Sequence, residues 1–173
     1  ILAEGVCFLG TALLLTLADH AIPGKKTAKT MTRGDALVIG AAQLMATLPG
    51  ISRSGSTISA GLIMGLSRSY AVAYSFILGL PAVLAAGLLD LKDLMSGTGA
   101  AASLEWGPAL VGMVVAAISG FFAIKLVNYI VNANKFRIFA IYTAVLGTVV
   151  VILGIIEIVT GNAIQGFIVG LLA

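Results

Sequence analysis

Four long apolar stretches constrain this sequence more than any other feature: about residues 2–18, 70–89, 107–131 and 138–159. A helix needs about 20 apolar residues to cross a bilayer. The chain is 60% hydrophobic and only 10% charged, whereas soluble domains carry roughly 25% charged residues. A surface so poor in charge would not keep a compact protein dissolved in water. We therefore predict a single transmembrane domain over residues 1–173, an all-α integral membrane protein with several spans.

The charged residues exclude several other classes of protein. The formal net charge is +3, and the basic residues lie mainly in short loops. We expect them to orient the spans and to contact membrane lipids, and we expect no nucleic-acid partner. The one cysteine, Cys7, allows no internal disulfide. Because no Cys, His and carboxylate residues have the spacing of a structural zinc site, no metal ligands are expected in this chain.

A fifth apolar region is interrupted. Two short apolar runs, about residues 36–48 and 56–66, flank the dipeptide Pro49-Gly50. The pair could cross the membrane once as a broken helix. It could also enter, turn and leave on the same side, as a re-entrant hairpin over about residues 36–66. The distribution of positive charge separates these two topologies.

The re-entrant topology gives the stronger charge asymmetry. A crossing would divide the loop cations five to three, whereas the hairpin leaves Lys92 alone on one side. We therefore predict a re-entrant hairpin with cytoplasmic open ends and a tip near the middle of the membrane. The cytoplasmic side then holds Lys25, Lys26, Lys29, Arg33, Arg68, Lys135 and Arg137.

The predicted tip combines a helix break with a permanent positive charge. It reads Pro49-Gly50-Ile51-Ser52-Arg53-Ser54-Gly55-Ser56-Thr57. Irregular backbone at membrane depth is tolerated only where it is buried in protein or lines a wet cavity. Arg53 stays charged at any accessible pH, and an arginine at the bilayer centre costs at least roughly 2.5 kcal/mol. The tip contains no acid, so the counter-charge must come from elsewhere in the protein or from an anionic ligand.

The tip also has the groups that bind an anion with several oxygens. The second short helix is expected to begin at Ser54-Gly55-Ser56, and a helix N-terminus offers free N–H groups and a partial positive charge. Arg53 supplies a planar fork that matches phosphate oxygens. The sequence therefore predicts a phosphate or diphosphate pocket. Hydroxyl donors are expected from Ser52, Ser54, Ser56 and Thr57, and close backbone approach at Gly50 and Gly55.

Two other interpretations stay open at this point. The tip could be a helix-packing element in which Arg53 pairs with a carboxylate for structural reasons alone. Broken helices also occur in transporters, so the chain could be half of a transporter or flippase, or a membrane module without catalytic activity.

A longer set of residues resembles the undecaprenyl-diphosphate phosphatase family of the bacitracin-resistance type. The tip motif carries most of the resemblance, which extends from near residue 1 to about residue 150. Further residues that carry it are Gly40-Ala41-Ala42-Gln43, Ala46, Ile58, Gly61, Gly65-Leu66-Ser67-Arg68 and Phe139-Ala140-Ile141-Tyr142.

The resemblance implies a multi-pass enzyme of the bacterial inner membrane. Such an enzyme hydrolyses undecaprenyl diphosphate to the monophosphate, which recycles the lipid carrier for cell-wall synthesis. The resemblance also implies inverted repeats with two re-entrant hairpins, of which this chain holds one, and a dependence on Mg²⁺ or Ca²⁺. It gives catalytic roles to Ser52, Arg53 and Thr57, with the attacking group left open. It gives substrate-binding roles to Gln43, Ser52, Arg53, Ser54, Gly55, Ser56 and Thr57.

The sequence departs from the family pattern where acids are expected. The family's first-half motif has two carboxylates four residues apart, then a serine-rich turn with a histidine, and no such stretch occurs here. Gln43 and Thr47 hold the equivalent spacing. The chain also opens at Ile1 inside an apolar run. We therefore expect a fragment, or a half that needs a complementary N-terminal half, with a homodimer as a further option. We expect no turnover by this chain alone.

Overall fold

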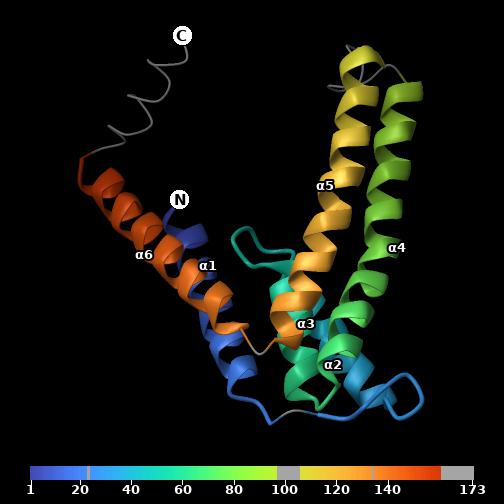
Figure 1. The fold of residues 1–173 in the computed structure, drawn as a ribbon. Coiled ribbons are helices and arrows are strands. Elements are labelled where there is room, and N and C mark those ends of the chain that lie inside the picture. The colour runs from blue at the N-terminus through green and yellow to red at the C-terminus, as the bar shows by residue number, and fades with distance from the viewer. Residues whose placement is uncertain (23, 97–105, 134, 161–173) are drawn as a thin grey trace.

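The fold is a set of helices that diverge from one end of the molecule (Figure 1). The computed structural model describes residues 1–22, 24–96, 106–133 and 135–160, and within them every regular element is a helix. Residues 161–173, which follow the last predicted span, lie outside the described residues. The helices are α1 (Leu2–Asp19), α2 (Arg33–Met45), α3 (Arg53–Ile63), α4 (Arg68–Met95), α5 (Trp106–Asn132) and α6 (Arg137–Val159).

Four of these helices are long and apolar enough to cross a membrane: α1, α4, α5 and α6. This confirms the prediction of an all-α, multi-pass membrane protein. One predicted boundary is wrong, because α4 continues to Met95, whereas the apolar stretch in the sequence ends at about residue 89. Residues 88–95 contain neither Gly nor Pro, and charged residues such as Asp90 and Lys92 do not by themselves end a helix.

The two short apolar runs form a helical hairpin, with α2 and α3 joined by a turn at residues 46–52. Thr32 caps α2 in a reciprocal capping box with Asp35, which satisfies two backbone donors at the helix start. Ser52 caps α3, because its hydroxyl oxygen accepts a hydrogen bond from the backbone N–H of Gly55. Consequently α3 begins at Arg53, one residue before the predicted start.

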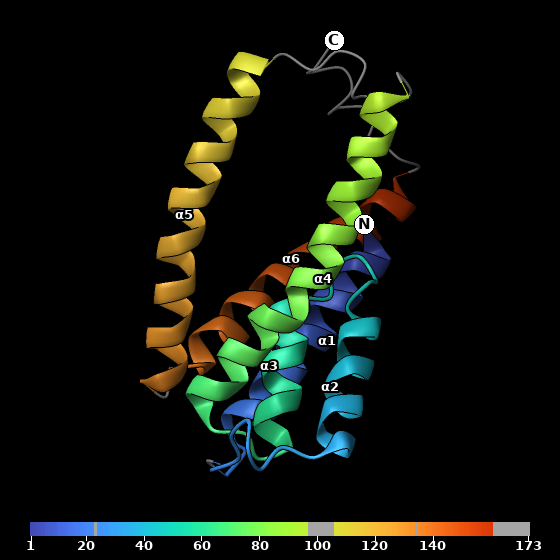
Figure 2. The same ribbon diagram turned by 90° about the vertical axis from the view of Figure 1, so that its right-hand side faces the viewer.

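One residue of the preceding loop holds the two open ends of this hairpin together. The backbone N–H of Lys26 donates to the Gly65 carbonyl at 3.0 Å, and the Lys26 carbonyl accepts from the Ser67 N–H at 2.9 Å. The Lys26 ammonium pairs with the buried Asp35 carboxylate at 2.8 Å. The start of α2 and the end of α3 therefore lie at the same end of the molecule (Figure 2). The depth of the hairpin in a membrane remains a prediction.

Small residues let α1 and α6 lie in close contact. An added Cβ at Gly147 would lie 3.0 Å from the Leu9 backbone nitrogen, and one at Gly154 would lie 2.9 Å from the Leu2 Cα. Glycines of this kind permit close approach of membrane helices, where van der Waals contact replaces the hydrophobic effect as the source of association.

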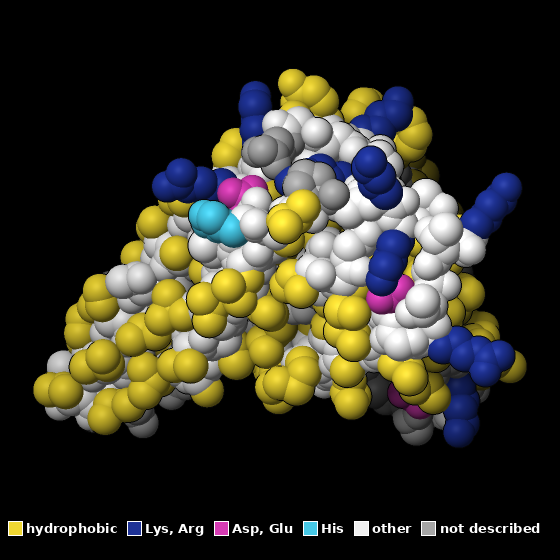
Figure 3. Space-filling model, turned by 90° about the horizontal axis from the view of Figure 1, so that it is seen from below, with side chains coloured by type: hydrophobic (Ala, Val, Ile, Leu, Met, Phe, Trp, Pro, Cys, Tyr) yellow, Lys and Arg dark blue, Asp and Glu magenta, His cyan; other side chains and the backbone are white. Residues whose placement is uncertain are grey.

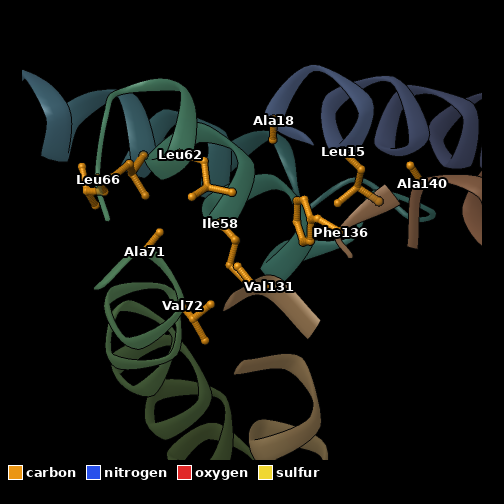
Figure 4. Close-up of a cluster of buried hydrophobic side chains, with 11 residues drawn as sticks. Leu15, Ala18, Ile58, Leu62, Leu66, Ala71, Val72, Val131, Phe136 and Ala140 are labelled. Atoms are coloured by element: carbon orange, nitrogen blue, oxygen red, sulfur yellow. The ribbon is translucent and has the colours of Figure 1, made fainter. Parts of the chain in front are cut away.

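The buried apolar core lies near the end from which the helices diverge. Figure 4 shows Phe136, which precedes α6, among side chains of α1 and α3. Phe136 is 2% exposed and Ile58 of α3 is also 2% exposed. This core fixes α3 in the centre of the fold, where it contacts α1, α2 and α4.

The same end of the molecule carries most of the basic side chains, as the view from below shows (Figure 3). The structure therefore groups these cations at one end of the molecule. They come from the loop before α2, from the first residues of α2, α4 and α6, and from the residues before α6: Lys25, Lys26, Lys29, Arg33, Arg68, Lys135 and Arg137.

Candidate anion site at the turn between α2 and α3

The turn between α2 and α3 is held against α1 by its backbone. Gly50 has a φ angle of +90°, a conformation that costs non-glycine residues roughly 1–2 kcal/mol. An added Cβ there would lie 2.6 Å from the Glu4 carbonyl oxygen. Next to it, the fully buried Thr11 hydroxyl accepts a hydrogen bond from the Ser52 backbone N–H at 3.2 Å. The close backbone contact at Gly50 is therefore with α1, whereas the sequence was interpreted as a close approach to an anion.

The first turn of α3 faces two directions. Along one face, α3 packs antiparallel to α4, and every fourth residue of α3 contacts every fourth residue of α4. The Arg53 guanidinium lies against Gly79, where even a methyl group would overlap it. Four residues on, the buried Thr57 hydroxyl shares a hydrogen bond with the buried Ser75 hydroxyl. Four further on, Gly61 faces Ala71. Arg53 and Thr57 therefore both point toward α4.

Arg53 is a partly buried cation that forms no ion pair with the described residues. Among the residues that the structure describes, the ion pairs join Lys26 to Asp35 and the N-terminus to Glu4. Gly79 lies eleven residues along α4 from Arg68, which is about 16 Å at the helical rise. The hydrocarbon core of a bilayer is about 30 Å thick. If α4 enters the hydrocarbon core at Arg68, then Gly79 and the Arg53 guanidinium beside it lie close to the bilayer centre.

Gln43 lies near this part of α4. Its amide nitrogen donates to the Leu78 carbonyl at 3.5 Å, one residue before the glycine that contacts Arg53. Its carbonyl oxygen is buried and accepts no hydrogen bond from the described residues. Gln43 therefore ties α2 to α4 and keeps one free acceptor.

The hydroxyls of α3 are unequally available. Ser56 is 1% exposed and its hydroxyl has no partner among the described residues. The Thr57 hydroxyl is occupied, since it donates to the Arg53 carbonyl at 2.9 Å in addition to its bond with Ser75. Ser52, in contrast, is exposed at the turn.

A cavity of about 490 Å³ opens beside the turn, between α1, α3, α5 and α6. Its polar wall contains Ser52, Ser54 and Gly55 at the start of α3. The remaining wall is mainly apolar and includes the side chains of Phe8, Leu15, Ile51, Ile58, Val127, Phe136, Phe139, Tyr142 and Leu146. The cavity therefore has one polar end and an apolar body, within the size range of small-molecule sites.

Two of the four N–H groups at the start of α3 are available for a ligand. The Gly55 N–H is bonded to the Ser52 hydroxyl, and the Ser56 N–H to the Ser52 carbonyl. Within the described part of the chain, the N–H groups of Arg53 and Ser54 have no hydrogen-bond acceptor. Two free donors at a helix N-terminus favour an anion.

The structure brings together some of the predicted site residues and separates others. Ser52, Ser54 and Gly55 share the cavity wall, whereas Arg53 and Thr57 face α4. Ser56 is buried and Gln43 lies on the α4 side.

The residues of the turn do not suit a divalent cation. Mg²⁺ and Ca²⁺ prefer carboxylate oxygens, and the turn offers neutral hydroxyls beside a permanent cation. In the described ranges, no three His, Cys, Asp or Glu side chains come together.

Three residues near the turn were not singled out in the sequence: Thr11, Ser75 and Gly79. Each lies inside a long apolar stretch, where spacing gives no sign of a polar contact. Thr11 and Thr16 look alike in the sequence, yet Thr11 alone of the two bonds to the turn.

Comparison with known proteins supplies an independent observation. A sequence model of the family "Bacitracin resistance protein BacA" matches residues 2–149. The Undecaprenyl-diphosphatase of Halothermothrix orenii is 44% identical over 149 residues, which are 86% of this chain and 57% of that protein. The Undecaprenyl-diphosphatase of Carboxydothermus hydrogenoformans is 40% identical, with the same shares of the two chains. That of Methanosphaera stadtmanae is 39% identical over 88% of this chain and 53% of its own length. The chain therefore spans about half the length of these relatives.

Proposed function

Because the chain belongs to the bacitracin resistance protein BacA family, we propose that it supplies the diphosphate-binding part of an undecaprenyl diphosphate phosphatase. The reaction is hydrolysis of the lipid diphosphate to the lipid monophosphate and phosphate. The observation that carries this proposal is the polar end of the cavity, where the start of α3 presents free N–H groups and the hydroxyls of Ser52 and Ser54. The Arg53 side chain, which has no carboxylate partner in the described residues, leaves the same helix turn toward α4.

The diphosphate would bind at the start of α3. The free N–H groups of Arg53 and Ser54 point along the helix axis, and the partial positive charge of the helix favours an anion there. The Ser52 and Ser54 hydroxyls on the cavity wall add donors. The structure favours Ser52 over Thr57 for direct contact with phosphorus, because Thr57 is buried and its hydroxyl is bonded to Ser75.

Arg53 would supply most of the charge. Its guanidinium rests on Gly79 beside the first turn of α3. A guanidinium bonds two phosphate oxygens at once. In a membrane, the ligand would in turn offset the cost of an arginine at this depth, which is at least roughly 2.5 kcal/mol. The predicted re-entrant hairpin is part of this proposal, since it brings the charge to that depth.

The apolar body of the cavity would hold the first part of the lipid chain. Phe136, Phe139 and Tyr142 form much of its wall. Aromatic side chains contribute large apolar contact areas. A lipid diphosphate, with one charged end and a long hydrocarbon chain, has the same division of polarity as the cavity.

The remaining groups of the site would come from outside this chain. We place the acid and base groups and the carboxylates for a divalent cation there, since the turn offers none. They would come from a complementary half of the same protein or of a partner chain. Because the chain belongs to this family, we also propose that it is located in the bacterial inner membrane.

Phosphate release tests this function. The chain in lipid nanodiscs would be supplied with undecaprenyl diphosphate, with and without the portion of the Halothermothrix orenii relative that the chain does not cover. We expect release only when both parts are present, and its loss with Arg53→Ala. Release that is unchanged in Arg53→Ala would contradict the proposal, and release by the chain alone would contradict the need for a second part.

A further inference from the structure

We infer that Thr11 of α1 is a positioning residue of the anion site, which it serves by fixing the backbone of Ser52. This inference rests on the proposed function. Thr11 is 0% exposed, whereas the other polar side chains of α1, those of Glu4, Thr16 and Asp19, are exposed or partly exposed. Its hydroxyl group is the polar link between α1 and the turn that carries the site.

The hydrogen bonds of Thr11 assign that role. Its hydroxyl donates to the Cys7 carbonyl at 3.1 Å within α1, and lies 3.4 Å from the Gly50 carbonyl. The same oxygen accepts from the Ser52 N–H at 3.2 Å. One side chain therefore touches both ends of the segment 50–52, which sets the direction in which α3 starts.

Ser52 is the residue through which Thr11 would act. Ser52 caps α3 and lines the polar end of the cavity. The Thr11 methyl group also lies near Gly55, where an added Cβ would be 3.5 Å from it. A shift of the Ser52 backbone would therefore move the hydroxyl and the free N–H groups that face the ligand. Binding geometry of this kind is sensitive to displacements of about 1 Å.

The first test substitutes the hydroxyl group alone. Thr11→Val keeps the shape of the side chain and leaves the Ser52 N–H without its acceptor. Calorimetric titration of undecaprenyl diphosphate into the chain in nanodiscs should give a Kd about 3- to 12-fold higher, the factor that corresponds to the net contribution of one hydrogen bond, because binding must then hold Ser52 in place without it. Thr11→Ser keeps the hydroxyl and should stay within about twofold of the unchanged chain.

Thr16→Val is the matched control. Thr16 lies on the same helix and donates to the Ala12 carbonyl at 2.8 Å, but it is exposed and does not reach the turn. Its Kd should not change. If Thr11→Val yields no folded protein, Thr11→Ala removes the same hydroxyl from a smaller side chain. A Thr11 variant that unfolds at a lower temperature yet binds with unchanged Kd would overturn the inference and leave a purely structural role.

A double-mutant cycle tests whether Thr11 acts through Ser52. In a Ser52→Ala chain, Thr11→Val should raise the Kd by a clearly smaller factor than in the unchanged chain. Equal factors in both backgrounds would overturn the inference. Arg53→Ala separates it from the proposed function. If Arg53→Ala binds as tightly as the unchanged chain, the proposed function fails. If Arg53→Ala weakens binding and Thr11→Val does not, only the role of Thr11 fails.

Discussion

Arg53 and Ser52 are neighbours in sequence, but their side chains leave the start of α3 toward different helices. Ser52 faces the cavity beside α1, and Arg53 rests on Gly79 of α4. A diphosphate carries oxygens on two phosphorus atoms. Its two phosphate groups can therefore contact donors on both sides of a helix N-terminus. The start of α3 is therefore the shared contact, and the two side chains lie on its flanks.

Replacement of Arg53 by lysine should separate charge from geometry. Arg53→Lys keeps the positive charge but loses the planar pair of donors. We expect the Kd for undecaprenyl diphosphate to rise by about three- to tenfold, less than for Arg53→Ala, in the same calorimetric titration. Equal affinity of the lysine and arginine chains would show that the guanidinium makes no two-point contact.

Gly50 should be intolerant of a side chain. Gly50→Ala would strain a backbone with a φ of +90° and would bring a Cβ to 2.6 Å from the Glu4 carbonyl oxygen. We expect a loss of at least about 1–2 kcal/mol in the free energy of unfolding, seen as a lower thermal midpoint in detergent.

Gly10→Ala is the control for that substitution. Gly10 lies on α1 with open space around it, so alanine there should leave the thermal midpoint unchanged or raise it slightly. Equal destabilisation by the two substitutions would contradict the close contact of the turn with α1.

Part of this site could be predicted from the sequence, and part could not. The break at Pro49-Gly50, the cap and the cation all follow from local rules of backbone and charge. The side that each residue of α3 faces depends on which helices surround it. That is why Arg53, Thr57 and Ser54 were expected to share one cradle, whereas the structure divides them between α4 and the cavity.

At the scale of elements, the loop before α2 closes the hairpin through one ion pair. The hydrogen bond from the Lys26 ammonium, with that from the Thr32 backbone N–H, lowers the pKa of Asp35 from 3.8 to about 2. Because this pKa is lower in the folded state, the pair stabilises the fold above about pH 4. That stabilisation is lost as the pH falls through about 2.

Hydrogen exchange should report this closure. We expect the Lys26 and Ser67 amides to exchange more rapidly as the pH is lowered from 4 to 2, once the rates are corrected for intrinsic exchange. Asp35→Asn should exchange rapidly at both pH values and lose the pH dependence. Protection that is equal in Asp35→Asn and the unchanged chain would show that the pair does not hold the loop.

The helix boundaries show what the hydrophobic pattern of the sequence predicts and what it misses. Hydrophobic length correctly predicted α1, α4, α5 and α6, because the bilayer dictates that length. It missed the last residues of α4, since the charged residues Asp90, Lys92 and Asp93 end the apolar stretch. A span can extend past the hydrocarbon region into water without a break, and no local signal in residues 88–95 ends it.

At the scale of the whole molecule, α5 is almost uncovered. In the most apolar 18 residues of that helix, none is buried. Lipid can cover such a surface, and so can the rest of a longer protein. The chain matches 53–57% of the length of the three relatives described above, and our proposal that acid and base groups come from outside this chain rests on that share.

The arrangement in the membrane can be tested by labelling from one side. In a Cys7→Ser chain, single cysteines at Thr30 and Ala133 should react with an impermeant maleimide from the same side of sealed vesicles. A cysteine at Ser96, at the far end of α4, should react from the other side. Reaction of Thr30→Cys and Ala133→Cys from opposite sides would indicate a crossing in place of the re-entrant hairpin.

Binding of the lipid diphosphate by this chain is the most direct measurement of the proposed site. Calorimetric titration in nanodiscs would compare undecaprenyl diphosphate with the neutral alcohol undecaprenol, for the unchanged chain and for Arg53→Ala. We predict saturable binding of the diphosphate alone, weakened at least about tenfold by Arg53→Ala. Equal binding of the two lipids, or equal binding by the two chains, would contradict an anion site at the start of α3.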